Sequence, residues 1–255
     1  EEFAKRSCTV ALWFGAVFSA GALLTGDVSA NVVARHQPAK LAAMEGHFES
    51  GPGDLTIVGW PDVEARKTPG IAIPGGLSFL IDRDFRAPVK GLSEFPETDW
   101  PPVRTTFASF HVMVALGMLF LAMTFGGLAG LRRGWIFTQR RLLWLYVPSV
   151  LGPYAANQAG WMVAEVGRQP WVVYGLLRTS DGVSRNVPAE HVLASIIGFG
   201  IVYGLLFLVW LFVMNDKIQH GPEDGTGHGD AGPGGFLAVS GAQGTGGHGS
   251  LTSGA

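Results

Sequence analysis

The sequence is poor in charge and has almost no cysteine. Charged residues make up 15% of the 255 residues, and the net charge is −2, whereas a soluble domain usually has about 25% charged residues. No run of basic residues could follow a phosphate backbone, which argues against a nucleic-acid partner. Cys8 is the only cysteine, so an internal disulfide and any CxxC or CxxCH site are excluded. A cofactor would therefore be held by non-covalent ligands.

The sequence contains several long hydrophobic stretches with few charged residues. Hydrophobic residues make up 47% of the chain, and the mean hydropathy is +0.28. Four stretches are long enough to cross a hydrocarbon core of roughly 30 Å as helices; they are residues 9–25, 107–131, 142–166 and 191–214. Buried helices of a large soluble protein are the alternative, but they do not explain why such long runs recur with few interior charges. We therefore expect an all-α transmembrane fold, a four-helix portion of a larger helical bundle.

The start of the chain bears on how the first stretch is interpreted. The chain begins at Glu1, and the apolar stretch lacks the basic segment and cleavage site of a signal peptide. We therefore expect residues 1–25 to form the first transmembrane helix rather than a signal peptide. The abrupt start indicates a piece of a longer or a split protein.

Basic residues predict which side of the membrane each loop faces. Short cytoplasmic loops carry an excess of arginine and lysine, and the loop at residues 132–141 is the basic one. Its arginines are Arg132, Arg133, Arg140 and Arg141. Alternation of the spans then puts residues 26–106 and 167–190 outside, and the N-terminus and residues 215–255 in the cytoplasm.

The long outer loop and the tail differ in composition. The loop at residues 26–106 is too long for a simple connector and is rich in proline and glycine turns, so we expect it to be functional. Its start, Pro38 to about Glu49, is typical of a short amphipathic helix. The tail at residues 215–255 is dominated by glycine from Gly221 onward. Such a segment cannot bury enough apolar surface to fold, so we expect it to be disordered.

Glu165 is the residue with the largest expected free-energy cost of burial, because its carboxylate lies at the predicted outer end of the membrane span at residues 142–166. A carboxylate near hydrocarbon is by default a candidate functional residue. Arg168 follows three residues later, on the same helical face, so a simple ion pair at the membrane surface is the alternative. Trp161 places an aromatic ring one turn earlier, and Pro170 ends the helix. These two features favour a binding pocket over a bare ion pair.

The segment around Glu165 carries a family resemblance. Residues 160–171 read GWMVAEVGRQPW, which matches the pattern GWxxAExGRQPW of the large subunit of cytochrome bd-type quinol oxidases at every fixed position. In that family the glutamate is the axial ligand of a high-spin haem, so the resemblance implies this role for Glu165. It also implies that Trp161 packs between clustered haems and that Arg168 neutralises haem propionates, a task suited to guanidinium.

The second span offers a methionine and a histidine. A methionine in a membrane helix is by default a lipid-facing or packing residue. The resemblance, however, implies that Met113 is the axial ligand of the low-spin haem b. His111 stands where many members carry arginine, and residues two apart on a helix cannot both bind one iron. We favour Met113, with His111 near a propionate or the quinol pocket, although histidine is the commoner haem ligand and stays the alternative.

The outer loop offers Lys40 and Glu45 after Gln37. On their own these two residues would be solvated charges of an ordinary amphipathic helix. In the family this loop binds quinol, and the spacing from lysine to glutamate matches. The resemblance therefore implies that Lys40 and Glu45 bind quinol and deprotonate it, and a carboxylate beside an ammonium is a plausible first proton acceptor.

The resemblance covers most of residues 1–218 but only the C-terminal half of the family's large subunit. It implies a terminal oxidase of the bacterial cytoplasmic (inner) membrane that oxidises quinol and reduces O2 to water, building a proton gradient without pumping. The implied cofactors are a low-spin haem b, a high-spin haem b, and haem d or a haem b in its place.

The same resemblance implies partners, because no histidine of this chain lies in an N-terminal helix of the kind that ligates haem d. The expected partners are the N-terminal half of subunit I, as a separate chain or missing sequence, and subunit II. A small accessory subunit and membrane lipid complete the set. Two rival hypotheses are a haem-free quinone-binding membrane anchor and a structural half-subunit.

Overall fold

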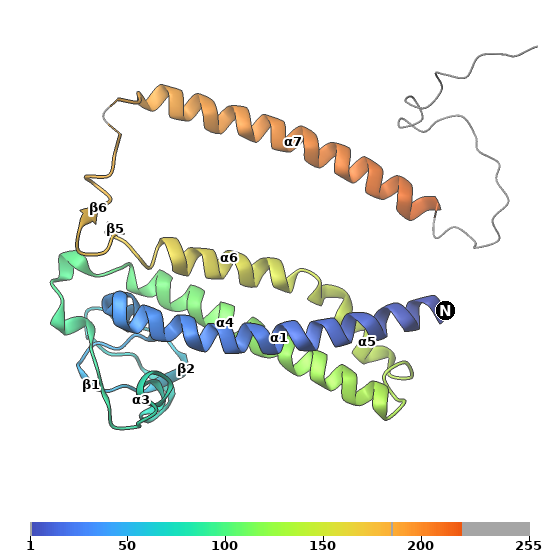
Figure 1. Ribbon diagram of the computed structural model, residues 1–255, viewed down its shortest axis with the longest axis horizontal. Helices are drawn as coiled ribbons and strands as arrows, with labels where there is room; N and C mark the ends of the chain where they lie inside the picture. The colour runs from blue at the N-terminus through green and yellow to red at the C-terminus, as the bar shows by residue number, and fades with distance from the viewer. Residues whose placement is uncertain (1, 185, 221–255) are drawn as a thin grey trace, which may run out of the picture. The chain divides into compact units, whose positions relative to one another are not determined.

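A computed structural model describes residues 2–184 and 186–220, and helices dominate it (Figure 1). The helices are α1 (Glu2–His36), α2 (Pro38–Glu45), α3 (Gly76–Asp82), α4 (Val103–Arg132), α5 (Arg140–Ser149), α6 (Gly152–Glu165) and α7 (Ala189–His220), with short 3-10 turns at Leu92–Glu94 and Glu97–Asp99. The strands are β1 (Gly51–Pro52), β2 (Leu55–Gly59), β3 (Gly70–Ile73), β4 (Pro88–Val89), β5 (Trp171–Val173) and β6 (Leu177–Arg178).

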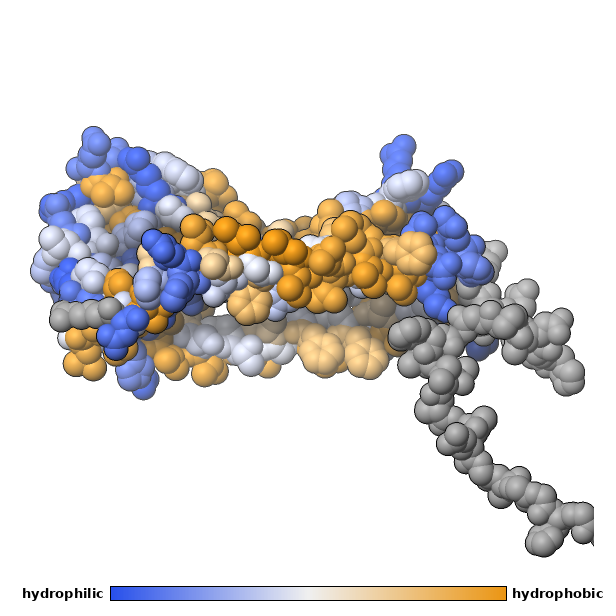
Figure 2. Space-filling view, turned by 90° about the horizontal axis from the view of Figure 1, so that it is seen from above, coloured by the Kyte–Doolittle hydropathy of each residue, from blue (hydrophilic) through white to orange (hydrophobic). Residues whose placement is uncertain are grey.

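Three of the described helices have the length and composition to cross a membrane. They are α1, α4 and α7, with peak mean hydropathies of 1.7, 2.1 and 2.6. Each extends beyond the apolar run that predicted it, because polar residues at its ends continue the helix into the interface. Hydrophobic side chains cover the middle of the long helices, and hydrophilic ones gather toward their ends (Figure 2). The fold is therefore that of a helical membrane protein.

The expected single helix at residues 142–166 is interrupted in the structure. Helix α5 ends at Ser149 and α6 begins at Gly152, so neither piece alone is long enough to cross. Pro153 has no N–H to donate to the carbonyl group one turn earlier, which interrupts the hydrogen-bond ladder at this point. The described chain thus has three long helices and one broken helical segment in place of four continuous spans.

Helix α4 is the central element of residues 2–184. It packs against α1 on one side and α6 on another, as Figure 1 shows. Glycines allow the helices to approach closely: a Cβ atom added to Gly15 of α1 would lie 2.8 Å from Thr124 of α4, and one added to Gly160 of α6 would lie 3.0 Å from Met113 Sδ. Small residues at such contacts are typical of helix packing in membranes.

The long loop between α1 and α4 is folded around α2. Pro38 starts α2 at a position where its missing N–H costs nothing, and Gly46 ends it in the left-handed region with φ 64°. Two small apolar clusters form on α2. One contains Ala42, Ala43, Phe48, Leu92 and Val103, and the other Leu41, Leu77 and Val89. The predicted helix is therefore present but mostly buried, in place of the amphipathic helix that we expected.

Two antiparallel pairs, β1 with β4 and β2 with β3, complete this loop. Strands β5 and β6 form a hairpin after α6. Helix α7, described by itself, has no buried residue among its 32 residues, as expected of a helix that is hydrophobic all round and meant for lipid or for other helices. It reaches His220, so residues 215–220 of the expected disordered tail are helical. The rest of that tail, residues 221–255, lies outside the described residues.

Candidate functional site

The C-terminal end of α6 holds an ion pair. Helix α6 ends at Glu165, and Arg168 donates from Nη2 to Glu165 Oε2 over 2.5 Å. Both side chains are partly exposed, Arg168 by 39% and Glu165 by 41%. The Nε atom of Arg168 is buried and has no hydrogen-bond partner within the part of the chain that the structure describes. The Glu165–Arg168 ion pair can therefore contact a bound molecule, and the N–H at Arg168 Nε can still donate a hydrogen bond to it.

Lys40 of α2 reaches the same end of α6. Its Nζ atom donates to the carbonyl oxygen of Ala164 over 3.2 Å. Burial lowers the pKa of Lys40; the positive charge of Arg168 lowers it further, while Glu165 opposes both. The lysine, the carboxylate and the guanidinium therefore share one electrostatic environment, although 124 residues separate Lys40 from Ala164 in the sequence.

Gly167 makes this close approach possible. It is buried, and a Cβ atom at this position would lie 2.4 Å from the Val163 carbonyl oxygen, 3.0 Å from Thr106 Cγ2 and 3.3 Å from Lys40 Cε. Only a residue without a side chain fits between α4, α6 and Lys40. Thr106 of α4 is fully buried, and its hydroxyl group has no partner among residues 2–184 and 186–220. Sequence reasoning missed both residues.

Glu45 is the most deeply buried ionisable group that sequence reasoning singled out. It is 4% exposed, and its Oε2 atom has no partner in the described ranges. Burial raises its pKa to about 8, against the opposing effect of a hydrogen bond from the backbone N–H of Thr56. The carboxyl group is therefore mostly protonated at neutral pH, in contrast to the solvated charge expected of an ordinary surface helix.

His111 and Met113 lie on α4, and their side chains have different surroundings. The ring of His111 stacks on Phe107 with centroids 3.8 Å apart. Its Nδ1 atom lies 3.0 Å from the Phe107 carbonyl oxygen, and its Nε2 atom 2.9 Å from the Thr56 carbonyl oxygen. The sulfur of Met113 instead faces Gly160 of α6. The ring nitrogens of His111 lie at hydrogen-bond distance from backbone carbonyl oxygens, whereas the Met113 sulfur has no hydrogen bond among the described residues.

Trp161 is separate from these contacts. It is 62% exposed on the surface of α6, and its ring makes none of the aromatic or hydrogen-bond contacts recorded for the described residues. A flat ring free on a helix surface can stack on another planar group. The structure thus brings Lys40, Glu165 and Arg168 together at the end of α6. His111 and Met113 lie on α4, and Glu45 lies at the end of α2, which packs against α4. Trp161 is exposed on the surface of α6.

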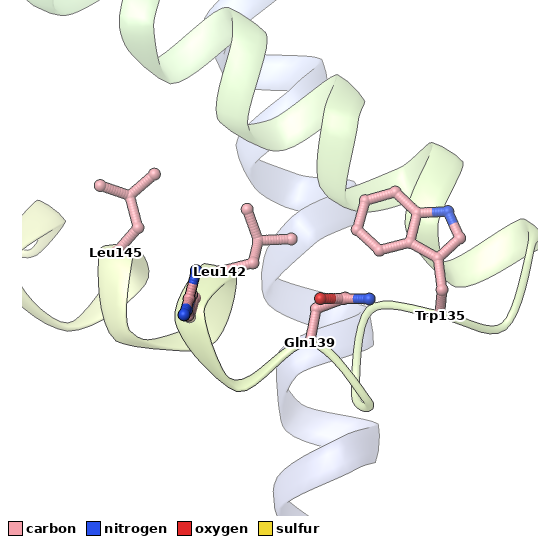
Figure 3. Close-up of a pocket in the computed structure, with 5 residues that line it drawn as sticks. Trp135, Gln139, Leu142 and Leu145 are labelled. Carbon is pink, nitrogen blue, oxygen red and sulfur yellow. The ribbon is translucent and has the colours of Figure 1, made fainter.

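A pocket of about 590 Å³ lies elsewhere, at the connection between α4 and α5. It is lined by Trp135, Gln139, Arg141, Leu142 and Leu145, and Figure 3 labels all of these but Arg141. It contains none of the candidate ligands. Within residues 2–184 and 186–220, no group of three or more His, Cys, Asp or Glu could hold a bare metal ion, so the donors singled out are isolated ones.

Comparison with known proteins gives a consistent result. The family model described as cytochrome bd terminal oxidase subunit I matches residues 1–222. Cytochrome bd ubiquinol oxidase subunit 1 of Bacillus subtilis (strain 168) is 34% identical over 238 residues, covering 89% of this chain and 51% of the relative. A putative cytochrome bd menaquinol oxidase subunit I of the same strain is 35% identical over 216 residues, covering 80% and 48%.

A solved structure is also similar. The bd oxidase from Geobacillus thermodenitrificans has a TM-score of 0.65 and 32% identity, covering 81% of this chain and 47% of that chain. The chain therefore spans about half the length of the relatives that it matches.

Proposed function

Because the chain belongs to the cytochrome bd terminal oxidase subunit I family, we propose that it is the C-terminal half of the haem-bearing subunit of a membrane quinol oxidase. The relatives are named as ubiquinol and menaquinol oxidase subunits, and the chain supplies about half of such a subunit. The assembled enzyme oxidises quinol at the outer face of the bacterial cytoplasmic membrane and reduces O2 to water, without a pumping step.

Glu165 and Met113 are the residues that would bind the iron atoms of two haems. The residues fit this role: Glu165 offers a half-exposed carboxylate, and the buried Nε of Arg168 lacks an acceptor that a haem propionate would provide. Met113 is favoured over His111, since the Nε2 atom of His111 already lies at hydrogen-bond distance from Thr56. The exposed face of Trp161 suits packing between haem planes. Bound haem supplies one-electron transfer and, at the oxygen site, the reduction of O2.

Lys40 and Glu45 are the proposed quinol-binding and proton-accepting residues. The ammonium group of Lys40 donates one hydrogen bond to Ala164, and either of its two other N–H groups can donate to a quinol oxygen. Glu45 has a pKa of about 8, which is close to the working pH and therefore suits a group that both accepts a quinol proton and releases it.

The remaining components come from other polypeptides. Histidines of the described residues are His36, His47, His111, His191 and His220, and the resemblance assigns none of them to haem d. We therefore propose that the N-terminal half of subunit I, subunit II and a small accessory subunit complete the enzyme within membrane lipid. The loop between α1 and α4 faces outward, and the C-terminal end of α7 faces the cytoplasm.

One observation carries the proposal: Lys40, the proposed quinol-binding residue, donates a hydrogen bond to the Ala164 carbonyl oxygen, next to Glu165 at the end of α6. The proposed quinol site and the proposed haem ligand Glu165 are therefore adjacent. A haem-free anchor would have no use for the half-exposed Glu165–Arg168 pair, and a structural half-subunit would have no use for a buried proton acceptor at Glu45.

Spectroscopy of the co-expressed assembly tests the proposal. Glu165→Ala should abolish the high-spin haem signal in reduced-minus-oxidised spectra, and Met113→Leu should convert the low-spin haem toward high spin. Glu64→Ala on the loop surface and Met118→Leu on the exposed side of α4 are matched controls that should leave both signals unchanged. An unchanged spectrum in Glu165→Ala refutes the ligand assignment, and an assembly without haem supports the anchor hypothesis.

A further inference from the structure

Strand β2 is joined to α4 by a contact between His111 and Thr56. The β2–β3 pair has only two strands, and its outer side chains are exposed, including Ile57 at 54% and Val58 at 64%. Such a pair is only marginally stable alone. Thr56, in contrast, is buried, and its carbonyl oxygen lies 2.9 Å from His111 Nε2 across 55 residues of sequence.

The surroundings of His111 fix the orientation of its ring. Phe107, which is 2% exposed, stacks on the ring at 3.8 Å and holds its plane. The Phe107 carbonyl group faces Nδ1, but as the residue four earlier in α4 it already accepts the backbone N–H of His111. A carbonyl oxygen can only accept, so His111 holds Thr56 by donating from Nε2, which a neutral ring protonated at this nitrogen can do.

Thr56 faces Glu45 with its other polar groups. The backbone of Thr56 lies close enough to the Glu45 carboxyl group to favour its charged form, and its hydroxyl group donates to the Glu45 backbone carbonyl oxygen over 3.4 Å. One residue of β2 therefore contacts Glu45 on one side and His111 on the other. A displacement of β2 from α4 would move the Thr56 backbone and its hydroxyl group away from Glu45.

We infer that His111 is a positioning residue, which holds Thr56 so that the Glu45 carboxyl group stays aligned to accept a proton from quinol. The inference rests on the proposed function for the role of Glu45, but the contact itself does not. It gives His111 a task that needs neither iron ligation nor a charge. It also links the helix that carries Met113 mechanically to the carboxyl group of the outer loop.

Two substitutions at His111 distinguish the effect of its hydrogen-bond donor from the effect of its stacking ring. His111→Gln keeps an N–H donor the same number of bonds from Cα, whereas His111→Phe keeps a stacking ring and removes the donor. In the co-expressed assembly, His111→Phe should lower kcat/KM for quinol about tenfold, the effect of one lost hydrogen bond, and His111→Gln should stay within about threefold of wild type. His36→Phe, at an exposed histidine of α1, is the matched control and should have no effect.

Two further measurements exclude a merely structural role. Hydrogen–deuterium exchange of the peptide covering β2 should be about tenfold faster in His111→Phe than in wild type or His111→Gln. In a Glu45→Gln background, His111→Phe should cause no further loss of kcat/KM, because it acts through Glu45. The haem spectrum should be the same in all these variants.

Three outcomes overturn the inference. These are unchanged exchange at β2 in His111→Phe, a full additional loss in the Glu45→Gln background, and a low-spin haem that becomes high-spin in His111→Phe, which would make His111 the ligand. If the wild-type assembly has no quinol oxidase activity, the proposed function fails, while the exchange measurement still decides whether His111 holds β2.

Discussion

At the scale of single residues, Glu45 combines deep burial with a pKa near the working pH. Its carboxyl group has a folded-state pKa of about 8, well above the ordinary 4.5. Below pH 8 it is mostly protonated and cannot accept a quinol proton; above pH 8 it is ionised and can. We therefore predict that kcat/KM for quinol rises with pH up to about 8 and that Glu45→Gln lowers it about 100-fold and removes this rise.

The matched control for this prediction is Glu49→Gln, four residues further along the loop, where the side chain is exposed. It should keep both the rate and the pH profile of the wild type. A rise with pH that persists in Glu45→Gln would assign the titrating group to another residue, and an unchanged rate would remove Glu45 from the proton path.

Which residue-scale features could be predicted depended on their spacing in the chain. The pairing of Glu165 with Arg168 follows from residues three apart near one helix end, and the structure contains it. The contact of His111 with Thr56 spans 55 residues and joins a backbone carbonyl to a ring, so no spacing rule indicates it. The burial of Glu45 was hidden for the same reason, since the segments that cover it come from other parts of the loop.

At the scale of secondary-structure elements, Gly167 controls how the end of α6 meets α4 and Lys40. A Cβ atom would lie 2.4 Å from a backbone oxygen of Val163, and backbone cannot move aside as a side-chain end can. We predict that Gly167→Ala shifts the last turn of α6, destabilises the assembly by about 1–3 kcal/mol and weakens the high-spin haem signal. Thermal unfolding of the purified assembly, together with difference spectra, measures both effects.

Gly117→Ala is the matched control on α4, where an added Cβ atom meets nothing within 4 Å among the described residues. It should be neutral or slightly stabilising, because alanine is the better helix former. Equal melting temperatures for Gly167→Ala and wild type would show that the close packing at Gly167 is not required.

The elements themselves were predictable to different degrees. Apolar runs indicated α1, α4 and α7, because length and hydropathy alone determine whether a helix can cross a membrane. The interruption between α5 and α6 was missed, because hydropathy averages over Pro148 and Pro153 without registering their missing N–H groups. The folding of the outer loop around α2 was also missed, since its apolar cluster joins Ala42, Leu92 and Val103 from distant positions.

At the scale of the whole molecule, the orientation in the membrane decides whether the proposed sites face the quinol side. Helix α4 has 30 residues and is therefore about 45 Å long, enough to cross a hydrocarbon core of roughly 30 Å. Ser93 before it and Thr138 after it should then lie on opposite sides. The arginines at residues 132–141 predict that Thr138 lies in the cytoplasm, and hence that Lys40, Glu45 and Glu165 lie on the outer face.

Cysteine labelling can test this orientation, because the chain has a single cysteine, Cys8. In a Cys8→Ser background, Ser93→Cys and Thr138→Cys introduce one thiol each at exposed positions. A membrane-impermeant maleimide applied to intact spheroplasts should label Ser93→Cys at once and Thr138→Cys only after permeabilisation. The reverse pattern would put the loop with Lys40 and Glu45 in the cytoplasm, where protons from quinol would be released on the side that supplies protons to O2, so quinol oxidation could no longer build a proton gradient.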